Sequence, residues 1–314
     1  MIAAVTGGTG FVGRALLARL VRAPEISEIR VLSRRDRPDA HTDARVRWIA
    51  GDLSEAGRHL GELLERADTV FHCAGEIRRE ARMRALHVDA TERLVRRAAG
   101  HVTVWVQLSS VGVYGRRRAD AVEESSPAAP RGEYETTKAQ ADGLVADAAS
   151  KGAFRHVILR PSIVFGPGMP NRSLYRLVSA IDRGWFAFIG REGAIANYVY
   201  VDDVADALAA CALSSGAEGV YNLSDDRTLA DFTGTIAKAL GRPAPGRRLP
   251  ETPVRLLARA LGRVPGFPLT ESRVDALTGR VRYPSTRIRR DLGYAFGVSI
   301  ESGLERFVED WRQQ

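Results

Sequence analysis

The stretch Val5-Thr6-Gly7-Gly8-Thr9-Gly10-Phe11-Val12-Gly13 lies between an apolar run at residues 2–6 and a helical pattern at 12–22. Three glycines at three-residue spacing suit a strand-to-helix turn. They permit a tight bend, close approach of a pyrophosphate to the backbone, and close packing of the helix on the strand. The first helical turn then presents unpaired N–H groups to the phosphates. The stretch predicts a dinucleotide-binding turn, with cofactor contacts from Gly7, Gly10, Phe11, Val12 and Gly13.

Strand-like and helical patterns alternate over the first half of the chain. The strand-like runs are 2–6, 28–33, 46–50, 69–74, 102–109 and 156–160, and the helical patterns are 12–22, 57–66, 82–99 and 134–150. Such alternation predicts an α/β fold with a Rossmann-type, doubly wound parallel sheet. After about residue 161 the pattern loosens, and helical stretches at 173–183, 202–213 and 229–240 are separated by loops.

This change of pattern predicts two domains. Residues 1–165 are expected to form an NAD(P)-binding Rossmann domain, to which elements at about 196–225 return. Residues 166–314 are expected to form mainly a smaller, mixed substrate-binding domain.

The composition excludes several classes of protein. The net charge is +8, but only Lys138, Lys151 and Lys238 are lysines, and the many arginines are scattered among acids, so we expect no nucleic-acid partner. No apolar run approaches the roughly 18 residues of a membrane span, and we expect neither a membrane partner nor a signal peptide. Two cysteines cannot make a disulfide framework, which favours a reduced, cytoplasmic protein.

The end of the second strand bears on the choice of cofactor. An acid in this position holds the ribose 2′-hydroxyl of NAD, whereas the chain has Ser33, Arg34 and Arg35 there. An arginine suits a 2′-phosphate, so the sequence favours NADP, with NAD as the alternative.

The chemistry-bearing residues follow the fifth strand. Ser110 stands at its end, and Tyr134 and Lys138 are four residues apart, hence on one face of the predicted helix. A free tyrosine has a pKa near ~10, and a neighbouring ammonium group favours the phenolate. These three residues therefore predict a general acid/base for hydride transfer at a carbinol or ketone, oriented by the serine hydroxyl.

Several motifs together resemble the extended branch of the short-chain dehydrogenase/reductase superfamily, the NAD-dependent epimerase/dehydratase family. They are the glycine turn, Gly51-Asp52-Leu53, residues 71–75, Ser110 with Tyr134 and Lys138, residues 159–168 (Leu-Arg-Pro-Ser-Ile-Val-Phe-Gly-Pro-Gly) and residues 198–205. The resemblance implies cofactor contacts from Asp52, Leu53, Cys73, Ala74, Gly75, Pro161 and Ile163, and again from Tyr134 and Lys138. His87 stands where the family has an asparagine.

Within this family the chain looks most like bacterial nucleotide-sugar epimerases and 4-keto reductases of polysaccharide biosynthesis. Dehydration is not expected, because Val111 and Gly112 follow Ser110 where dehydratases carry Asp-Glu. Ala196 replaces a diphosphate-binding arginine of galactose epimerases. The substrate candidates are therefore Glu76, Asn171, Arg172, Arg191 and Arg282.

The resemblance implies hydride transfer on a nucleotide-activated sugar, at C4, by a homodimer that joins through 82–99 and 134–150. No metal site is expected. Two alternatives stay open, namely an NADPH-dependent reductase of an apolar ketone, sterol-like or flavonoid-like, and a non-catalytic NAD(P)-sensing protein.

The stretch 253–263 is amphipathic and is bracketed by prolines. A membrane-surface helix is one interpretation. We expect instead that its face of Val254, Leu256, Leu257, Ala260 and Leu261 packs over the substrate cleft.

Overall fold

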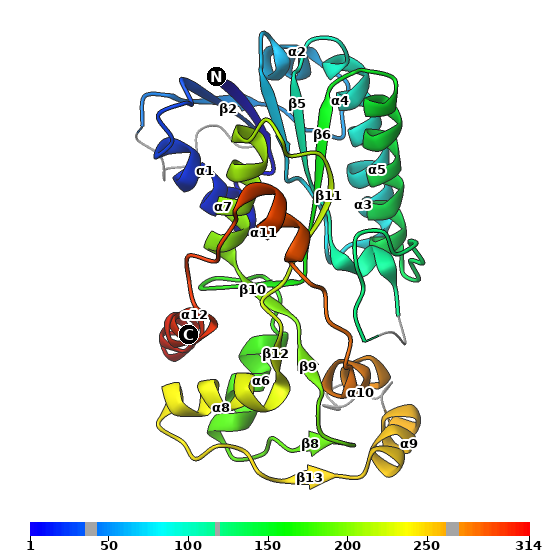
Figure 1. Ribbon diagram of the computed structural model, residues 1–314, viewed down its shortest axis with the longest axis vertical. Helices are drawn as coiled ribbons and strands as arrows, with labels where there is room; N and C mark the ends of the chain where they lie inside the picture. Colours follow the sequence, from blue (N-terminus) through cyan, green and yellow to red (C-terminus); the bar gives the residue numbers. More distant parts are fainter. Residues whose placement is uncertain (35–42, 117–119, 262–269) are drawn as a thin grey trace.

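The sheet of the upper lobe in Figure 1 is the central element of the fold. The computed structural model describes residues 1–34, 43–116, 120–261 and 270–314. Seven parallel strands run in the order β11-β6-β5-β4-β1-β2-β3. They are β1 (Ile2–Thr6), β2 (Glu28–Ser33), β3 (Val46–Ala50), β4 (Thr69–His72), β5 (Val104–Leu108), β6 (Arg155–Pro161) and β11 (Gly219–Leu223). The predicted Rossmann-type sheet is confirmed.

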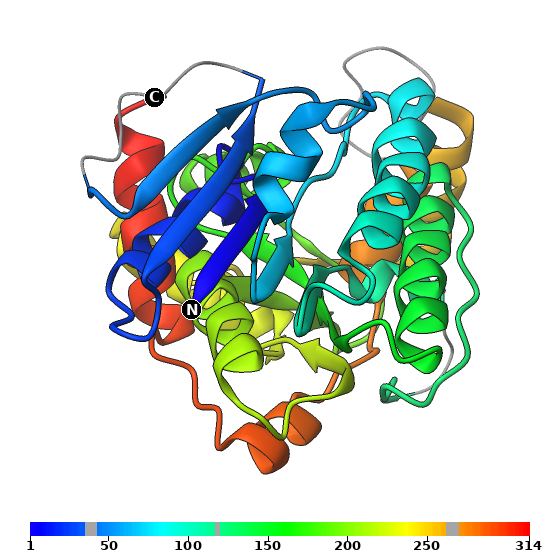
Figure 2. The same cartoon turned by 90° about the horizontal axis from the view of Figure 1, so that it is seen from above.

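Alternate residues of the strands face two helix layers, as strand geometry requires. Ala3 and Val5 of β1 belong to one core, with α1 (Phe11–Val21) and α7 (Val201–Leu213). Ala4 belongs to the opposite core, with α2 (Arg58–Leu64), α4 (Ala90–Ala98) and α5 (Glu133–Ser150). Figure 2 shows α4 and α5 on one side of the sheet and α7 on the other. This doubly wound arrangement buries both faces of the sheet.

The strand order reverses between β1 and β4, and open α/β sheets bind ligands at such a point. Gly7 lies there with φ +72°, and a Cβ on it would come within 2.6 Å of the Ala74 backbone nitrogen. A Cβ on Gly13 would overlap the Gly7 carbonyl. The two glycines therefore let the turn after β1 pass between the end of β4 and helix α1.

The lower lobe has its own apolar core between three helices, α6 (Ser173–Asp182), α8 (Leu229–Leu240) and α12 (Ile300–Arg312). Three strand pairs extend it: β7 (Ile163–Phe165) with β10 (Tyr198–Tyr200), β9 (Ile195–Ala196) with β12 (Arg227–Thr228), and β8 (Phe188–Ile189) with β13 (Arg248–Leu249). Helices α9 (Glu251–Leu261) and α10 (Glu271–Thr278) close its end, and α11 (Thr286–Leu292) returns to β11.

Helix α9 differs from its prediction. Val254 and Ala258, one turn apart, are buried against β8 and α10. Leu256, Leu257 and Leu261 are 59%, 46% and 38% exposed, and Ala260 is exposed as well. The predicted apolar face therefore does not pack over a cleft. Of the apolar side chains of that helix, only Val254 and Ala258 pack on β8 and α10, and the leucines stay exposed. Throughout the described ranges, no helix is both long and apolar enough to cross a bilayer.

Candidate active site

Ser110, Tyr134 and Lys138 lie at the carboxyl end of β5. Ser110 directly precedes the 3₁₀ turn η2 (Val111–Tyr114), and its Oγ accepts a hydrogen bond from the Gly112 N–H at 3.0 Å. Tyr134 and Lys138 are on the first turns of α5, which packs beside β5. The Ser110 hydroxyl lies close enough to the Tyr134 phenol to oppose part of the rise in its pKa. The structure thus brings the three predicted residues into one group.

Buried contacts fix the position of Lys138, which is 5% exposed. Its Nζ donates to the carbonyl of Leu108, the last residue of β5. Burial lowers the pKa of Lys138, whereas the Asp142 carboxylate, one helical turn further along α5, raises it. Asp142 accepts from the Ser109 hydroxyl at 2.8 Å and from Arg160 at 3.0 Å. The ammonium group is therefore held between a strand end and a buried acid.

The Tyr134 phenol has a pKa different from the prediction. Burial raises the pKa of Tyr134 to about 12, and the neighbouring Ser110 hydroxyl opposes this only in part. The sequence predicts that Lys138, together with the positive nicotinamide ring of a bound cofactor, lowers this pKa. In the structure the Lys138 ammonium is engaged by Leu108, and desolvation of the phenol dominates. Tyr134 is consequently protonated at neutral pH.

His87 lies beside Tyr134, with ring centroids 5.7 Å apart and planes at 82°. Its Nε2 accepts from the Glu76 N–H at 2.8 Å, and its Nδ1 is 2.8 Å from the Thr137 hydroxyl on α5. The histidine thus fills the asparagine position of the family with two direct hydrogen bonds.

The turn after β1 fits a dinucleotide pyrophosphate. Helix α1 begins at Phe11, its N-cap Gly10 provides no side-chain hydrogen bond, and no acid lies in its first turn. The amides of the first turn and the positive end of the helix dipole are therefore available to an anion. Phe11, Val12 and Gly13, the predicted contacts, form that turn.

Arg34 follows β2 and is exposed, whereas Ser33 is 5% exposed. Ser54 donates to the Asp52 carboxylate through N–H (2.8 Å) and hydroxyl (2.7 Å). These bonds lower the pKa of Asp52, and the charges of Arg34 and Arg82 lower it further. Two cations thus lie near the carboxyl ends of β2 and β3. Arg35 lies outside the described residues.

The other predicted cofactor residues lie along the same sheet edge. Ala74 and Leu53 are buried, and Gly75 is exposed beyond β4. Burial raises the pKa of the Cys73 thiol to about 12, so this cysteine is protonated and unreactive. Pro161 ends β6, and Ile163 is 41% exposed just beyond it. Exposed apolar surface at this strand end suits one face of a nicotinamide ring.

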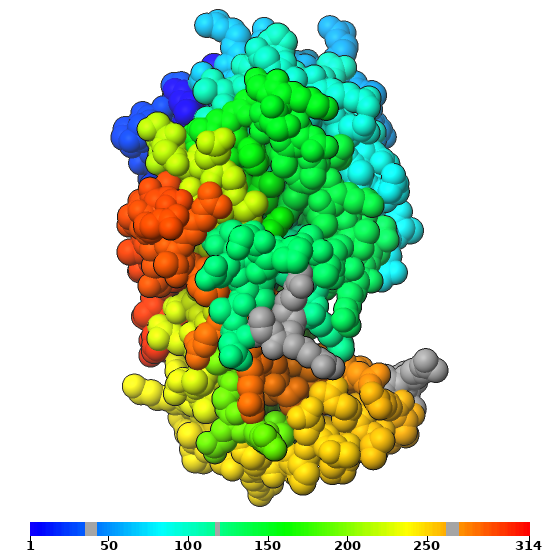
Figure 3. Space-filling model, turned by 45° about the vertical axis from the view of Figure 1, so that its right-hand side comes forward, coloured from blue at the N-terminus to red at the C-terminus, as the bar shows by residue number. Residues whose placement is uncertain are grey.

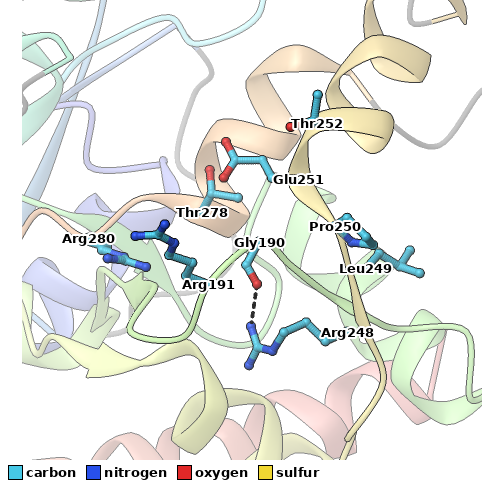
Figure 4. A pocket seen from close by; sticks show the side chains of 9 residues that line it. All are labelled: Gly190, Arg191, Arg248, Leu249, Pro250, Glu251, Thr252, Thr278 and Arg280. Atoms are coloured by element: carbon cyan, nitrogen blue, oxygen red, sulfur yellow. Dashed lines mark hydrogen bonds between the residues drawn. The ribbon is translucent and has the colours of Figure 1, made fainter.

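A cavity of about 750 Å³ lies in the lower lobe between β8, β13, α9 and α10. Its lining includes Arg191, Arg248 and Arg280 (Figure 4). Arg248 donates to the Gly190 carbonyl at 3.1 Å, as drawn there. Glu251, Thr252 and Thr278 provide further polar groups. Three guanidinium groups with one carboxylate make the cavity suitable for an anion.

The structure separates the five predicted substrate residues, all of which lie in its described part. Arg191 lines this cavity, and the other four do not. Arg172 bonds Gln314 and stacks on Tyr175 at 5.0 Å, while Asn171 accepts from the Ser173 N–H at the start of α6. The Glu76 carboxylate accepts from its own loop, and Arg282 is exposed outside the cavity.

Sequence reasoning missed Arg248 and Arg280. The sequence carries one indication of Arg280: Thr278 and Gly279 end a helix, and Arg280 directly follows that helix end. Arg248 lies in a proline-containing stretch next to another arginine, and nothing there sets it apart in the sequence. It reaches the cavity only because β13 pairs with β8.

The cavity is linked to the chain that follows Ser110. The Val122 N–H donates to the Arg282 carbonyl, and the Arg282 N–H donates to the Asp120 carbonyl, both at 2.9 Å. Arg116 pairs with Asp275 of α10. In Figure 3 this teal segment lies directly above the gold and orange lobe that holds α9 and α10. Arg280 is thus two residues from a direct contact with the loop between Ser110 and Tyr134.

Residues 3–224 match the model of the NAD dependent epimerase/dehydratase family. The chain belongs to this family. One relative is 33% identical over 79% of this chain and 84% of its own length, the dTDP-6-deoxy-L-talose 4-dehydrogenase (NAD(P)(+)) of Kitasatospora kifunensis. Another is 26% identical over 98% of this chain and 79% of its own length, the 3beta-hydroxysteroid-dehydrogenase/decarboxylase isoform 1 of Arabidopsis thaliana.

A solved structure supports the fold. UDP-glucuronic acid 4-epimerase from Bacillus cereus, in complex with NAD, superposes with a TM-score of 0.77 at 19% identity, over 100% of this chain and 99% of that one. The predicted membership of the epimerase/dehydratase family is confirmed, and the protein is an enzyme of the extended short-chain dehydrogenase/reductase type with a Rossmann fold.

Proposed function

We propose that this enzyme transfers hydride between a nicotinamide cofactor and C4 of a nucleotide-activated sugar. The observation that carries the proposal is the grouping of Ser110, Tyr134 and Lys138 at the carboxyl end of β5, next to the switch point of the sheet. The bound nicotinamide would supply or accept the hydride. Tyr134 would exchange the proton of the sugar hydroxyl, and Ser110 would hold the same oxygen.

The protonated Tyr134 phenol can supply the proton that reduction of a keto sugar requires. A phenol with its pKa raised to about 12 carries the proton that a developing alkoxide must receive. Epimerisation and 4-keto reduction would use the same three residues. We propose 4-keto reduction as the direction because cells commonly supply reductions with NADPH, which Arg34 would favour, and epimerisation is the alternative.

The arginine-lined cavity supports a nucleotide-linked substrate. Charge-assisted, bidentate contacts from guanidinium groups are well suited to a diphosphate, and Arg191, Arg248 and Arg280 surround one space. A site for a sterol-like ketone would be apolar, so the cavity argues against that alternative despite the steroid dehydrogenase among the relatives. The intact acid/base group argues against a cofactor sensor.

The cofactor, location and assembly belong to the same proposal. Arg34 and Arg82 near the adenosine end of the site favour NADP over NAD. Residues 1–165 and the return at 196–225 would bind the cofactor, and 166–314 mainly the substrate. We place the enzyme in the cytoplasm, as a homodimer joined through α4 and α5.

Replacing Tyr134 by phenylalanine tests the function. Wild-type protein should reduce at least one member of a panel of UDP- and dTDP-linked 4-keto sugars with NADPH. Tyr134→Phe should lower this turnover by roughly 10²–10⁴-fold, because a positioned acid/base contributes that much. NADPH affinity, measured by calorimetry, should stay nearly unchanged because the phenol is not expected to contact a phosphate.

Two results would contradict the function. Near-wild-type turnover by Tyr134→Phe would remove the assigned acid/base. Turnover of apolar ketones, with none on any nucleotide sugar, would favour the sterol-like alternative.

A further inference from the structure

His87 is 1% exposed and lies in a π-helical turn, η1 (Ala85–Asp89), between α3 (Glu80–Arg84) and α4. Such turns within helices are rare and often occur at functional sites. Both ring nitrogens have partners at 2.8 Å, the Glu76 N–H for Nε2 and the Thr137 hydroxyl for Nδ1. The side chain therefore joins the segment after β4 to helix α5.

The partners determine where the His87 proton is. A backbone N–H can only donate, so Nε2 must be the acceptor and the proton is on Nδ1. The Thr137 hydroxyl donates to the Glu133 carbonyl at 2.7 Å, which leaves its oxygen free to accept from Nδ1. Burial and the Lys138 charge lower the pKa of His87 to about 3, which keeps this neutral form at physiological pH.

The Glu76 end of this contact leads to the lower lobe. The Glu76 carboxylate accepts from the N–H groups of Ile77 (3.1 Å) and Arg78 (3.0 Å) and from the Arg79 guanidinium (3.0 Å). Arg78 in turn donates to the Pro170 carbonyl, ahead of α6. Residues 76–79, hereafter the strap, thus bridge the two lobes, and His87 anchors the end next to Tyr134.

The Thr137 end leads to the acid/base. Thr137 is on the same turn of α5 as Tyr134 and directly precedes Lys138. The His87 ring also meets the Tyr134 ring edge to face. One side chain therefore contacts the strap, helix α5 and the phenol ring together.

We propose that His87 is a positioning residue that ties the strap to helix α5 and thereby sets the orientation of the Tyr134 phenol. The inference rests on the proposed function, in which Tyr134 is the acid/base. His87 itself touches neither the reacting atoms nor the proton that moves. Its neutral ring provides the one acceptor and one donor that the Glu76 N–H and the Thr137 hydroxyl require.

Three variants separate the two hydrogen bonds. His87→Gln can place an amide oxygen near the position of Nε2 and keep the bond from Glu76. His87→Asn is shorter and can keep only the bond to Thr137. His87→Leu loses both. The first readout is NMR of ring-labelled tyrosine, with the Tyr134 signal assigned by its loss in Tyr134→Phe. The second is kcat and KM with a 4-keto sugar that the wild-type protein reduces.

His87→Leu should displace the Tyr134 signal and lower kcat, by up to roughly 100-fold, as small misplacements of reacting groups do. NADPH affinity should not change. His87→Gln and His87→Asn each keep only one of the two bonds, so each should give a smaller displacement of the signal and a smaller loss of kcat than His87→Leu.

Thr137→Val keeps His87 and serves where His87→Leu does not fold. It should displace the same signal. Thr233→Val is the matched control, since Thr233 is also buried on a helix, α8, and also donates to the carbonyl four residues earlier, yet holds no other side chain. The control should leave the Tyr134 signal unchanged even if it lowers the melting temperature.

The proposal is overturned if the folded His87→Leu or Thr137→Val protein shows a wild-type Tyr134 signal and kcat. It is equally overturned if His87→Gln and His87→Leu lose activity alike while Thr233→Val shifts the Tyr134 signal as they do. The NMR readout needs no substrate, so it stands even if Tyr134→Phe shows that the proposed function is wrong.

Discussion

Arg34 is the residue on which we base the proposed preference for NADP over NAD. It is exposed directly after β2, and its charge reaches Asp52 at the neighbouring strand end. A planar guanidinium suits a 2′-phosphate, whereas a bound ribose 2′-hydroxyl would call for the carboxylate that Ser33 does not provide. One charge-assisted hydrogen bond is worth about 1.5–3 kcal/mol, or roughly 10- to 150-fold in affinity.

We therefore expect NADPH to bind more tightly than NADH, and Arg34→Ala to lose most of this preference while NADH affinity stays the same. Calorimetric titration of both nucleotides measures it. Arg183→Ala is the control, because Arg183 stacks on Trp185 in the lower lobe. Equal affinities of the wild type for both nucleotides would exclude the NADP proposal and favour the epimerase.

Elements with a strong periodic pattern lie where the sequence predicts them. Strands β1, β2 and β3 begin and end at the predicted residues, and α5 begins one residue before its predicted start. Pairs such as β8 with β13 could not be predicted, because two-residue strands carry no periodicity. The π turn at Ala85–Asp89 was also missed, since it interrupts an otherwise helical pattern.

The proximity of Tyr134 and Lys138 could be predicted because their spacing is local, four residues along one helix. The cavity could not, because it needs the contacts between β8, β13 and α10 that bring distant arginines together. For helix α9 the sequence predicts more burial than the structure shows. Its apolar residues extend over a wider face than the one that α10 buries.

The arginines near the end of α10 lead to a second prediction, which concerns nucleotide binding in the cavity. Arg280 lines the cavity, whereas Arg282, two residues further on, is exposed outside it. Arg280→Ala should weaken UDP and dTDP binding by roughly 10-fold or more, the cost of one charge-assisted contact. Arg282→Ala, which removes the same charge, should have little effect. Calorimetry with both nucleotides measures the difference, and equal losses would assign the binding to net charge instead of the cavity.

At the scale of the whole molecule, buried histidines couple folding to pH. Burial lowers the pKa of both His72 and His87 to about 3, with Lys138 acting in the same direction on each. In the unfolded chain both titrate near ~6.5. Their stabilising contribution is therefore complete above pH ~6.5. Below that value it falls by about 1.4 kcal/mol per pH unit and histidine, because only the unfolded chain takes up the protons.

Asp203 acts in the opposite direction. Burial raises its pKa to about 6, so the folded state binds this proton first and gains stability as the pH falls through 6. Burial raises the pKa of Asp142, Asp202 and Asp225 as well. It lowers the pKa of His156. Asp203 by itself begins to titrate about half a unit later than the histidines and does not offset two of them. We therefore expect the free energy of unfolding to fall by on the order of 2 kcal/mol between about pH 7.5 and about pH 5.5.

Urea unfolding at these two pH values measures the fall. The double variant His72→Asn/His87→Gln should flatten the dependence whatever its absolute stability, because amides do not titrate. Asp203→Asn should steepen it, since the opposing group is removed. A wild-type protein equally stable at both pH values would show that the two histidines take up protons in the folded state. The neutral form assigned to His87 at the anchor of the strap would then be wrong as well.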